Sequence, residues 1–188
     1  MNIDQKLALI QARIDKLLSC RDRITVAIEG PCTSGKTTLA AALAQTNDCN
    51  VIHMDDFFLR PEQRTPERYA EPGGNLDYER FEKEVLLPLQ SGKEFSYRPF
   101  DCKTFALAQP VPITPKRLTV IEGSYSLHPY FGKPYDLKIL LTVAPELQHE
   151  RILNRPEFLQ EQFFTRWIPM ENRYLDTFGI QDQVDLVL

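Results

Sequence analysis

The sequence contains few cysteines and histidines, and neither type is spaced for a metal site. No C-x-x-C pair connects its four cysteines, Cys20, Cys32, Cys49 and Cys102. Scattered cysteines of this kind are typical of reduced thiols rather than of a disulfide framework or a zinc site. The three histidines also lie far apart without metal-ligand spacing, so we expect ordinary surface or core histidines.

Long hydrophobic runs and blocks of positive charge are also missing. No stretch reaches the roughly 18 apolar residues of a membrane-spanning helix. Lys and Arg number 22 against 26 Asp and Glu, which gives a formal charge of −4. A nucleic-acid polymer and an anionic membrane surface are therefore not expected partners. Because residues 1–22 lack the pattern of a signal peptide, we expect a cytoplasmic protein.

Strand and helix patterns alternate along the 188 residues, a length that suits a single domain. Apolar residues at helical spacing predict an N-terminal amphipathic helix over 1–22, which would pack on the domain or mediate a homodimer. Further helices are expected at 37–45, 76–92, 145–155 and 157–178. Apolar strand candidates occupy 24–30, 50–54, 117–123 and 136–143, and the apolar segment 184–188 closes the chain.

The strand candidates are apolar on both faces, which is typical of parallel strands buried between two layers of helices. We therefore predict an α/β fold with a parallel five-stranded sheet and helices on both faces. The helix at 76–92 is expected to break near Pro88. Prolines predict surface loops at 59–75 and 109–115.

The most specific motif is GPCTSGKT at residues 30–37, which matches G-x-x-x-x-G-K-[ST] between a predicted strand and a predicted helix. Two glycines let the backbone curl, so that amide groups and the helix N-terminus converge on phosphate oxygens. Lys36 can reach the β- and γ-phosphates, and the Thr37 hydroxyl can bind Mg²⁺. We predict a nucleotide site formed by Gly30, Thr33, Ser34, Gly35, Lys36, Thr37 and Thr38.

Two carboxylates, Asp55 and Asp56, stand at the end of the second predicted strand. If this strand ends beside the phosphate loop, one carboxylate can accept the proton of an attacking hydroxyl or hold Mg²⁺ through water. The base-reading motif N-K-x-D of G proteins is absent, and 188 residues leave no room for a motor core. These features favour a kinase.

Five segments occur in an order that resembles the uridine kinase branch of the P-loop kinases: GPCTSGKT, HMDDFFLRP, GGNLDYERF, YRPFD and VIEGSYSL. This branch includes nicotinamide riboside kinases and is related to phosphoribulokinase. The resemblance covers roughly residues 22 to 175. It implies one P-loop kinase domain over 1–188, with a lid at about 154–167, which uses ATP and Mg²⁺ to phosphorylate a hydroxyl.

The resemblance also implies roles for individual residues. Asp55, and second Asp56, would be the catalytic base beside Lys36. Thr37, Asp55 and Glu122 would hold Mg²⁺. The acceptor pocket would be lined by Asp77 on the ribose hydroxyls and by the segment from Arg98 to Asp101, with Phe100 where a tyrosine is usual. The lid arginines would be Arg151, Arg155 and Arg166.

Some alternatives remain open from the sequence. Asp77 can equally be an acid at a helix start, and Arg151 and Arg155 can form a solvated helix face. Phe105 stands where the family has a histidine that reads a pyrimidine, which disfavours uridine and cytidine. Relatives continue beyond residue 188 into an adenine-holding loop, so we expect weak discrimination among triphosphates.

The acceptor is left open by the sequence. A nucleoside or similar riboside is the first expectation, and pantothenate, glycerate or a sugar phosphate is the alternative. A third reading is a nucleotide-binding regulator with slow NTP hydrolysis, because the predicted lid is poor in arginine.

Overall fold

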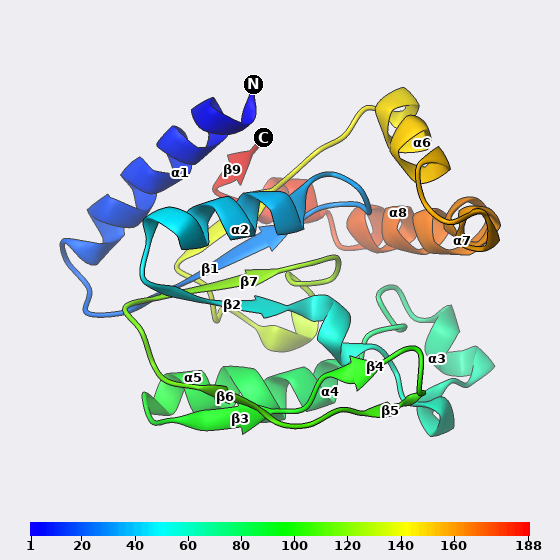
Figure 1. Ribbon diagram of the computed structural model, residues 1–188, viewed down its shortest axis with the longest axis horizontal. Coiled ribbons are helices and arrows are strands. Elements are labelled where there is room, and N and C mark those ends of the chain that lie inside the picture. Colours follow the sequence, from blue (N-terminus) through cyan, green and yellow to red (C-terminus); the bar gives the residue numbers. More distant parts are fainter.

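A parallel five-stranded sheet forms the centre of the computed structural model, which describes all 188 residues (Figure 1). The strands lie in the order β2-β7-β1-β8-β9, and every pairing is parallel. Their bounds are β1 (Ile24–Glu29), β2 (Cys49–His53), β7 (Leu118–Glu122), β8 (Leu137–Leu140) and β9 (Leu186–Val187). The predicted sheet is confirmed.

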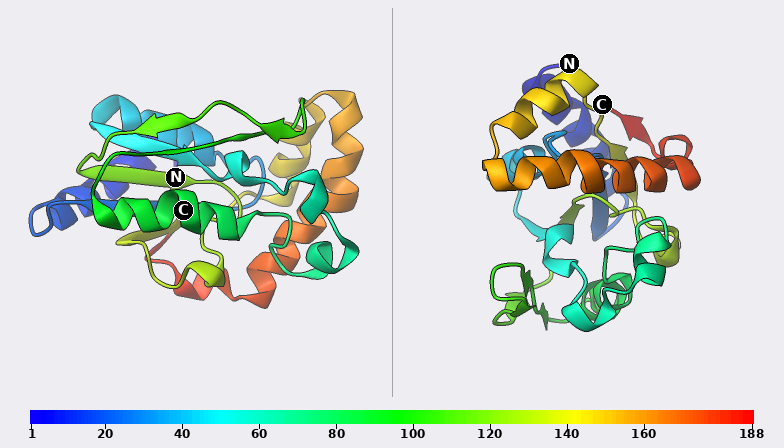
Figure 2. Two further views of the ribbon diagram at one scale, coloured as in Figure 1. Left: turned by 90° about the horizontal axis from the view of Figure 1, so that it is seen from below. Right: turned by 90° about the vertical axis from the view of Figure 1, so that its right-hand side faces the viewer.

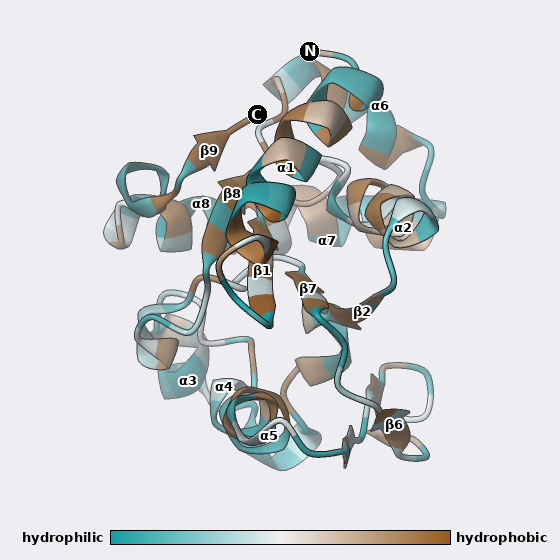
Figure 3. Cartoon of the chain, turned by 90° about the vertical axis from the view of Figure 1, so that its left-hand side faces the viewer, coloured by the Kyte–Doolittle hydropathy of each residue, from teal (hydrophilic) through white to brown (hydrophobic).

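Helices cover both faces of the sheet, as predicted. Helices α1 (Ile3–Leu18) and α2 (Lys36–Thr46) cover one face, and α4 (Tyr78–Phe81), α5 (Leu87–Ser91) and α8 (Ile168–Thr177) cover the other. The apolar strands lie between these layers (Figure 3). The remaining helices are α3 (Pro66–Ala70), α6 (Pro145–Leu153) and α7 (Glu157–Gln162).

Two separate clusters of buried side chains hold the layers together. One lies between α1, α2 and the sheet and includes Ile10, Ile14, Leu39, Leu43, Val26 and Val120. The other lies between the opposite face and α4, α5 and α8, and includes Phe57, Phe81, Val85, Ile121 and Tyr174. The two clusters explain why the strand sequences are apolar at nearly every position.

The helix around Pro88 is continuous, so the predicted break is wrong. Residues Glu82–Leu86 form a π-turn in which the Leu87 amide donates to the Glu82 carbonyl, five residues back. Proline lacks an N–H group and crowds the carbonyl four residues earlier, and a wider turn relieves that conflict. The same device joins α7 to α8, where the π-turn Phe163–Trp167 precedes Pro169.

The predicted loop 109–115 is also partly wrong, because β6 (Val111–Ile113) pairs with β3 (Phe95–Tyr97) in an antiparallel ribbon. A two-stranded ribbon has free edges, where the missing amide of a proline costs no ladder hydrogen bond. A second ribbon joins β4 (Phe100–Asp101) to β5 (Ala106–Leu107).

The predicted loop 59–75 contains a 3-10 turn at Pro61–Gln63 and the short helix α3. Both begin with a proline, which is favoured in the first turn of a helix. The segment is therefore more ordered than its proline content indicates.

The carboxyl ends of the sheet strands point toward α6, α7 and α8, which pass across that end of the molecule (Figure 2). In parallel α/β sheets, ligands bind beyond the carboxyl ends of the strands. No helix is both long enough and apolar enough to span a bilayer.

Candidate functional site

The loop between β1 and α2 has the backbone of a phosphate cradle. Gly30 and Gly35 have φ angles of +148° and +99°, and a Cβ at Gly30 would lie 2.4 Å from the Leu141 carbonyl oxygen. Only glycine suits these two positions. The hydroxyls of Thr33 and Ser34 are buried without a hydrogen-bond partner. Because buried polar groups are normally paired, these hydroxyls fit a loop that receives a polar ligand such as a triphosphate.

The ammonium group of Lys36 lies folded over this loop. Its Nζ donates to the carbonyls of Gly30 and Pro31 at 2.8 and 2.9 Å, and to Ser124 Oγ at 3.3 Å. Only 8% of Lys36 is exposed. No acidic side chain pairs with it in an ion pair, so its charge is available to an anion that enters the loop.

A cavity of about 690 Å³ opens beside the loop. Residues 33–39 of the loop and α2 form one wall, and Arg151, Asn154 and Arg155 at the end of α6 form another. Arg151 Nη1 donates to the Thr33 carbonyl at 2.7 Å. This volume lies within the range of about 300–1,000 Å³ that is usual for small-molecule sites.

Thr37, His53 and Glu122 meet next to the loop. The Thr37 hydroxyl donates to the Glu122 carboxylate at 3.1 Å, and His53 Nδ1 lies 2.6 Å from the same carboxylate. This hydrogen bond raises the pKa of His53. His53 and Glu122 are the paired last residues of β2 and β7. The family motif had already singled out Glu122, but His53 was not predicted, because only the register of β2 against β7 places it opposite Glu122.

The residues near Thr37 fit Mg²⁺ only in combination with a nucleotide. No group of three or more His, Cys, Asp or Glu side chains could hold a metal by itself. Mg²⁺ commonly takes one or two carboxylates and completes its shell with water and substrate phosphates. The hydroxyl of Thr37 and the carboxylate of Glu122 have the oxygen chemistry to supply the protein part of such a set.

The two neighbouring aspartates have different surroundings. Asp56 Oδ2 accepts a hydrogen bond from the Tyr97 hydroxyl at 2.9 Å. Asp55 accepts no hydrogen bond, and part of the residue is open to solvent although protein surrounds its carboxylate. Desolvation by the surrounding protein raises the pKa of Asp55; Lys36 lowers it, and the negative charges of Glu122 and Glu171 raise it further. Asp55 is therefore an unpaired carboxylate within electrostatic range of Lys36.

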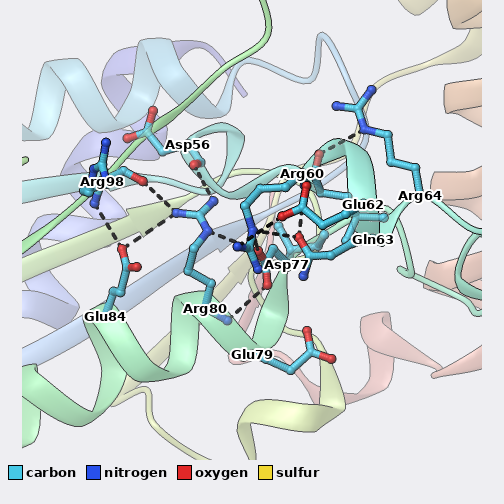
Figure 4. A network of polar contacts seen from close by, with 12 residues as sticks. Asp56, Arg60, Glu62, Gln63, Arg64, Asp77, Glu79, Arg80, Glu84 and Arg98 are labelled. Carbon is cyan, nitrogen blue, oxygen red and sulfur yellow. Dashed lines mark hydrogen bonds and ion pairs between the residues drawn. The ribbon is translucent and has the colours of Figure 1, made fainter. Parts of the chain in front are cut away.

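Asp77 caps the start of α4 and is held by two arginines (Figure 4). Its carboxylate accepts from the backbone amide of Arg80 at 3.2 Å and from Arg80 Nε at 3.1 Å, and Arg60 Nε lies 3.5 Å away. The Asp77 side chain is only 1% exposed. Its oxygens are thus occupied inside the protein, as in the helix-start interpretation.

The side chains of Arg98 and Asp101 form hydrogen bonds within the β4–β5 hairpin. The Arg98 guanidinium donates to the carbonyls of Leu107 and Ala108 at 3.0 and 2.9 Å. Asp101 accepts from the Lys103 amide at 2.7 Å. Neither side chain is joined by a hydrogen bond or ion pair to the phosphate loop or to Asp55.

Phe100 lies behind an arginine that bears no acidic partner. Phe100 is buried, and the Arg64 guanidinium lies 5.4 Å from its ring and 5.1 Å from the ring of Phe105. The charges of Arg64 and Asp55 both act on the Cys102 thiol, whose pKa is raised chiefly by burial. The lid candidate Arg166 lies apart from the cavity, over the ring of Tyr69 at 4.6 Å.

Glu29, the last residue of β1, joins the phosphate strand to the segment after β7. Its buried carboxylate accepts from the amides of Gly30, Tyr125 and Leu127 at 2.9–3.0 Å and from the Tyr174 hydroxyl at 3.0 Å. Burial raises the pKa of Glu29, and the backbone amides oppose that shift. The sequence signal was an acid at the end of an apolar strand, as at Glu122.

We expect Glu29→Gln to lower the free energy of unfolding by about 2–4 kcal/mol. The substitution replaces one carboxylate oxygen by an NH₂ group, which cannot accept, so the backbone N–H groups that face it would lose their partner. Urea denaturation checks this value. The matched control is Glu150→Gln on the exposed face of α6, for which a change within about 0.5 kcal/mol is expected. Equal stabilities for the two variants would contradict the assigned role.

Glu171, on α8, holds the phosphate loop from the opposite side. Its carboxylate accepts from the Cys32 amide at 2.8 Å and from the Ser124 hydroxyl at 2.7 Å, and Ser124 Oγ in turn accepts from Lys36. Burial, and then the charge of Glu171, raises the pKa of the Cys32 thiol to about 12. No sequence signal distinguished Glu171 within an aromatic-rich helix.

We expect Glu171→Gln to reduce kcat by about 10-fold, since the loss of one charge-assisted hydrogen bond corresponds to roughly that factor. The amide group cannot accept from both Cys32 and Ser124, so the loop and Lys36 would lose a fixed position. Steady-state kinetics beside Glu161→Gln, an exposed position on α7, checks the effect. A lower melting temperature with unchanged kcat would limit Glu171 to stability.

The comparisons with known proteins identify the fold. No family model and no curated protein matches the sequence. Among solved structures, a candidate uridine kinase from Bacillus stearothermophilus superimposes with a TM-score of 0.76 at 20% identity, covering 100% of both chains. A candidate fructose transport system kinase from Silicibacter sp. TM1040 gives 0.70 at 24% identity, covering 100% of this chain and 99% of that one.

Both similarities extend over the whole chain. The chain therefore has the fold of the P-loop kinases, and its structural neighbours include a candidate uridine kinase, the kind of kinase that its motifs resemble.

Proposed function

We propose that this chain is a kinase that uses ATP and Mg²⁺ to phosphorylate a hydroxyl of a small molecule, with a nucleoside or similar riboside as the first expected acceptor. The main support is Asp55, an unpaired carboxylate on which the charges of Lys36, Glu122 and Glu171 all act, so that it lies within electrostatic range of the phosphate-binding lysine. A base beside a phosphate-binding lysine is the arrangement that hydroxyl phosphorylation requires.

Each residue has a role in this proposal. The loop amides and Lys36 bind and orient the phosphates, and Asp55 orients the acceptor hydroxyl and accepts its proton. Arg151 and Arg155, at the cavity wall, offset charge on the phosphates. Mg²⁺ held by Thr37 and Glu122 would neutralise developing negative charge. Positioning and electrostatic stabilisation together contribute most of the rate in such a transfer, because its transition state is loose.

A second candidate is a kinase for an acceptor that is not a riboside and that carries an anionic group. The burial of Asp77 between Arg60 and Arg80 favours it, because a carboxylate occupied in this way offers no free oxygen to a ribose diol. Arg64 supports it as well. Its Nε donates to the Leu59 carbonyl at 3.0 Å, and no carboxylate forms an ion pair with it.

The test is coupled ADP production with ATP and Mg²⁺ against ribosides, pantothenate, glycerate and sugar phosphates. Acceptor-dependent ADP with a riboside supports the first proposal, and the same result with an anionic acceptor supports the second. ADP at one slow rate with every acceptor and with none would contradict both, and would favour a nucleotide-binding regulator that hydrolyses NTP slowly.

A further inference from the structure

We infer that the first turn of α1 is part of the nucleotide site. In this inference Ile3 packs against the base of a nucleoside triphosphate, and Lys6 faces its polar atoms. The inference rests on the proposed nucleotide binding and adds to it the element that holds the nucleoside.

The apolar stripe of α1 extends past the surface that it covers. Ile10 and Ile14 pack against α2 and the sheet and are 0% exposed. Ile3 stands seven residues before Ile10, so it lies on the same face of the helix. It is nevertheless 42% exposed. A large apolar side chain in line with a buried stripe, but uncovered, fits a surface that a ligand completes.

The cavity beside the phosphate loop explains why Ile3 is uncovered. Its third wall is the start of α1, made by Met1, Asn2, Ile3 and Lys6. A triphosphate held by the loop amides leaves its nucleoside in the remainder of the same cavity. That remainder is bounded by the first turn of α1 and the end of α6.

Two cations face this remainder without an acidic partner. The Lys6 ammonium and the Arg155 guanidinium form no ion pair and no hydrogen bond, and the two residues belong to different walls of the cavity. A guanidinium can stack on an aromatic base, and an ammonium can meet ribose, phosphate or ring-nitrogen acceptors. The apolar Ile3 side chain together with the Lys6 and Arg155 cations is chemically complementary to a nucleotide base, which has a flat apolar face and polar edges.

The first turn of α1 is held in place before any ligand binds. Asn2 and Gln5 form a reciprocal capping box, with hydrogen bonds of 2.9 and 3.1 Å. Farther along the helix, Gln11 and Asn47 exchange side-chain hydrogen bonds of 2.8 and 3.1 Å, which fix α1 to the end of α2. A preformed wall avoids part of the ordering cost of binding.

The experiment compares two ligands by calorimetry, ATP and inorganic tripolyphosphate, on the full chain. Removing the Ile3 side chain in Ile3→Ala should weaken ATP binding by about 5- to 10-fold, and should leave tripolyphosphate binding unchanged. The double variant Ile3→Ala/Lys6→Ala should weaken ATP binding further. Lys16→Ala in the last turn of α1 is the matched control, for which wild-type affinity for both ligands is expected.

The outcomes separate the two proposals. If ATP binds the wild type and both variants within twofold, the role of α1 is wrong while nucleotide binding stands. If Ile3→Ala weakens ATP and tripolyphosphate equally, the base contact is wrong. If the wild type binds neither ligand, the proposed function fails and the inference fails with it.

Discussion

Lys36→Ala should reduce acceptor-dependent ADP production by about 100- to 1,000-fold in kcat, the loss that follows removal of one preorganised donor to developing charge. The ammonium now rests on the carbonyls of Gly30 and Pro31, from which it can turn toward a bound phosphate. Without it, the loop amides alone would face the negative charge. We expect nucleotide affinity to fall less than kcat, because the amides and the start of α2 remain.

The measurement is initial-rate kinetics with the best acceptor from the panel, together with ATP titration by calorimetry. Lys116→Ala is a matched control, because Lys116 pairs with Asp48 at 2.7 Å, away from the cavity. Wild-type kcat in Lys36→Ala would exclude phosphoryl transfer at this loop.

Asp55→Asn should reduce kcat by about 100- to 10,000-fold, the usual contribution of a positioned general base. An amide cannot accept the hydroxyl proton, and it removes a negative charge near Lys36. Asp56→Asn should reduce kcat much less, because the Asp56 carboxylate is already engaged by Tyr97.

The comparison needs both variants under the same conditions, with melting temperatures as a check on folding. We expect a lower melting temperature in Asp56→Asn, since its bond to the buried Tyr97 is weakened, and an unchanged one in Asp55→Asn. If Asp56→Asn instead loses kcat and Asp55→Asn keeps it, the base is Asp56.

The sheet and the phosphate loop could be predicted because their signals are local. Apolar runs bounded by glycine or acidic residues predicted all the long strands, and the spacing of Gly30, Gly35 and Lys36 predicted the turn between β1 and α2. The meeting of Thr37 with Glu122 also follows from topology, since neighbouring parallel strands end at the same edge.

The features that could not be predicted from the sequence depend mostly on contacts between segments that are distant in it. Glu171 accepts a hydrogen bond from the amide of Cys32, which lies 139 residues away in the sequence. Nothing in the sequence around Glu171 predicts that bond. Asp77 is an acid before a helix in either interpretation, and only the positions of Arg60 and Arg80 show that its oxygens are occupied. The predicted break at Pro88 ignored the π-turn, which lets a helix accept proline without ending.

The π-turn before Pro169 also sets the phase of the helix that follows it. One extra residue in a helix rotates every later side chain by about 100° relative to an unbroken α-helix. Glu171 and Tyr174 lie beyond this turn, one on the Cys32 amide and the other on Glu29. In an α-helix without the insertion, the same two side chains would turn about a quarter of a circle away from the phosphate loop. A proline that carries no functional group thus fixes the direction in which α8 presents the two residues that hold the loop.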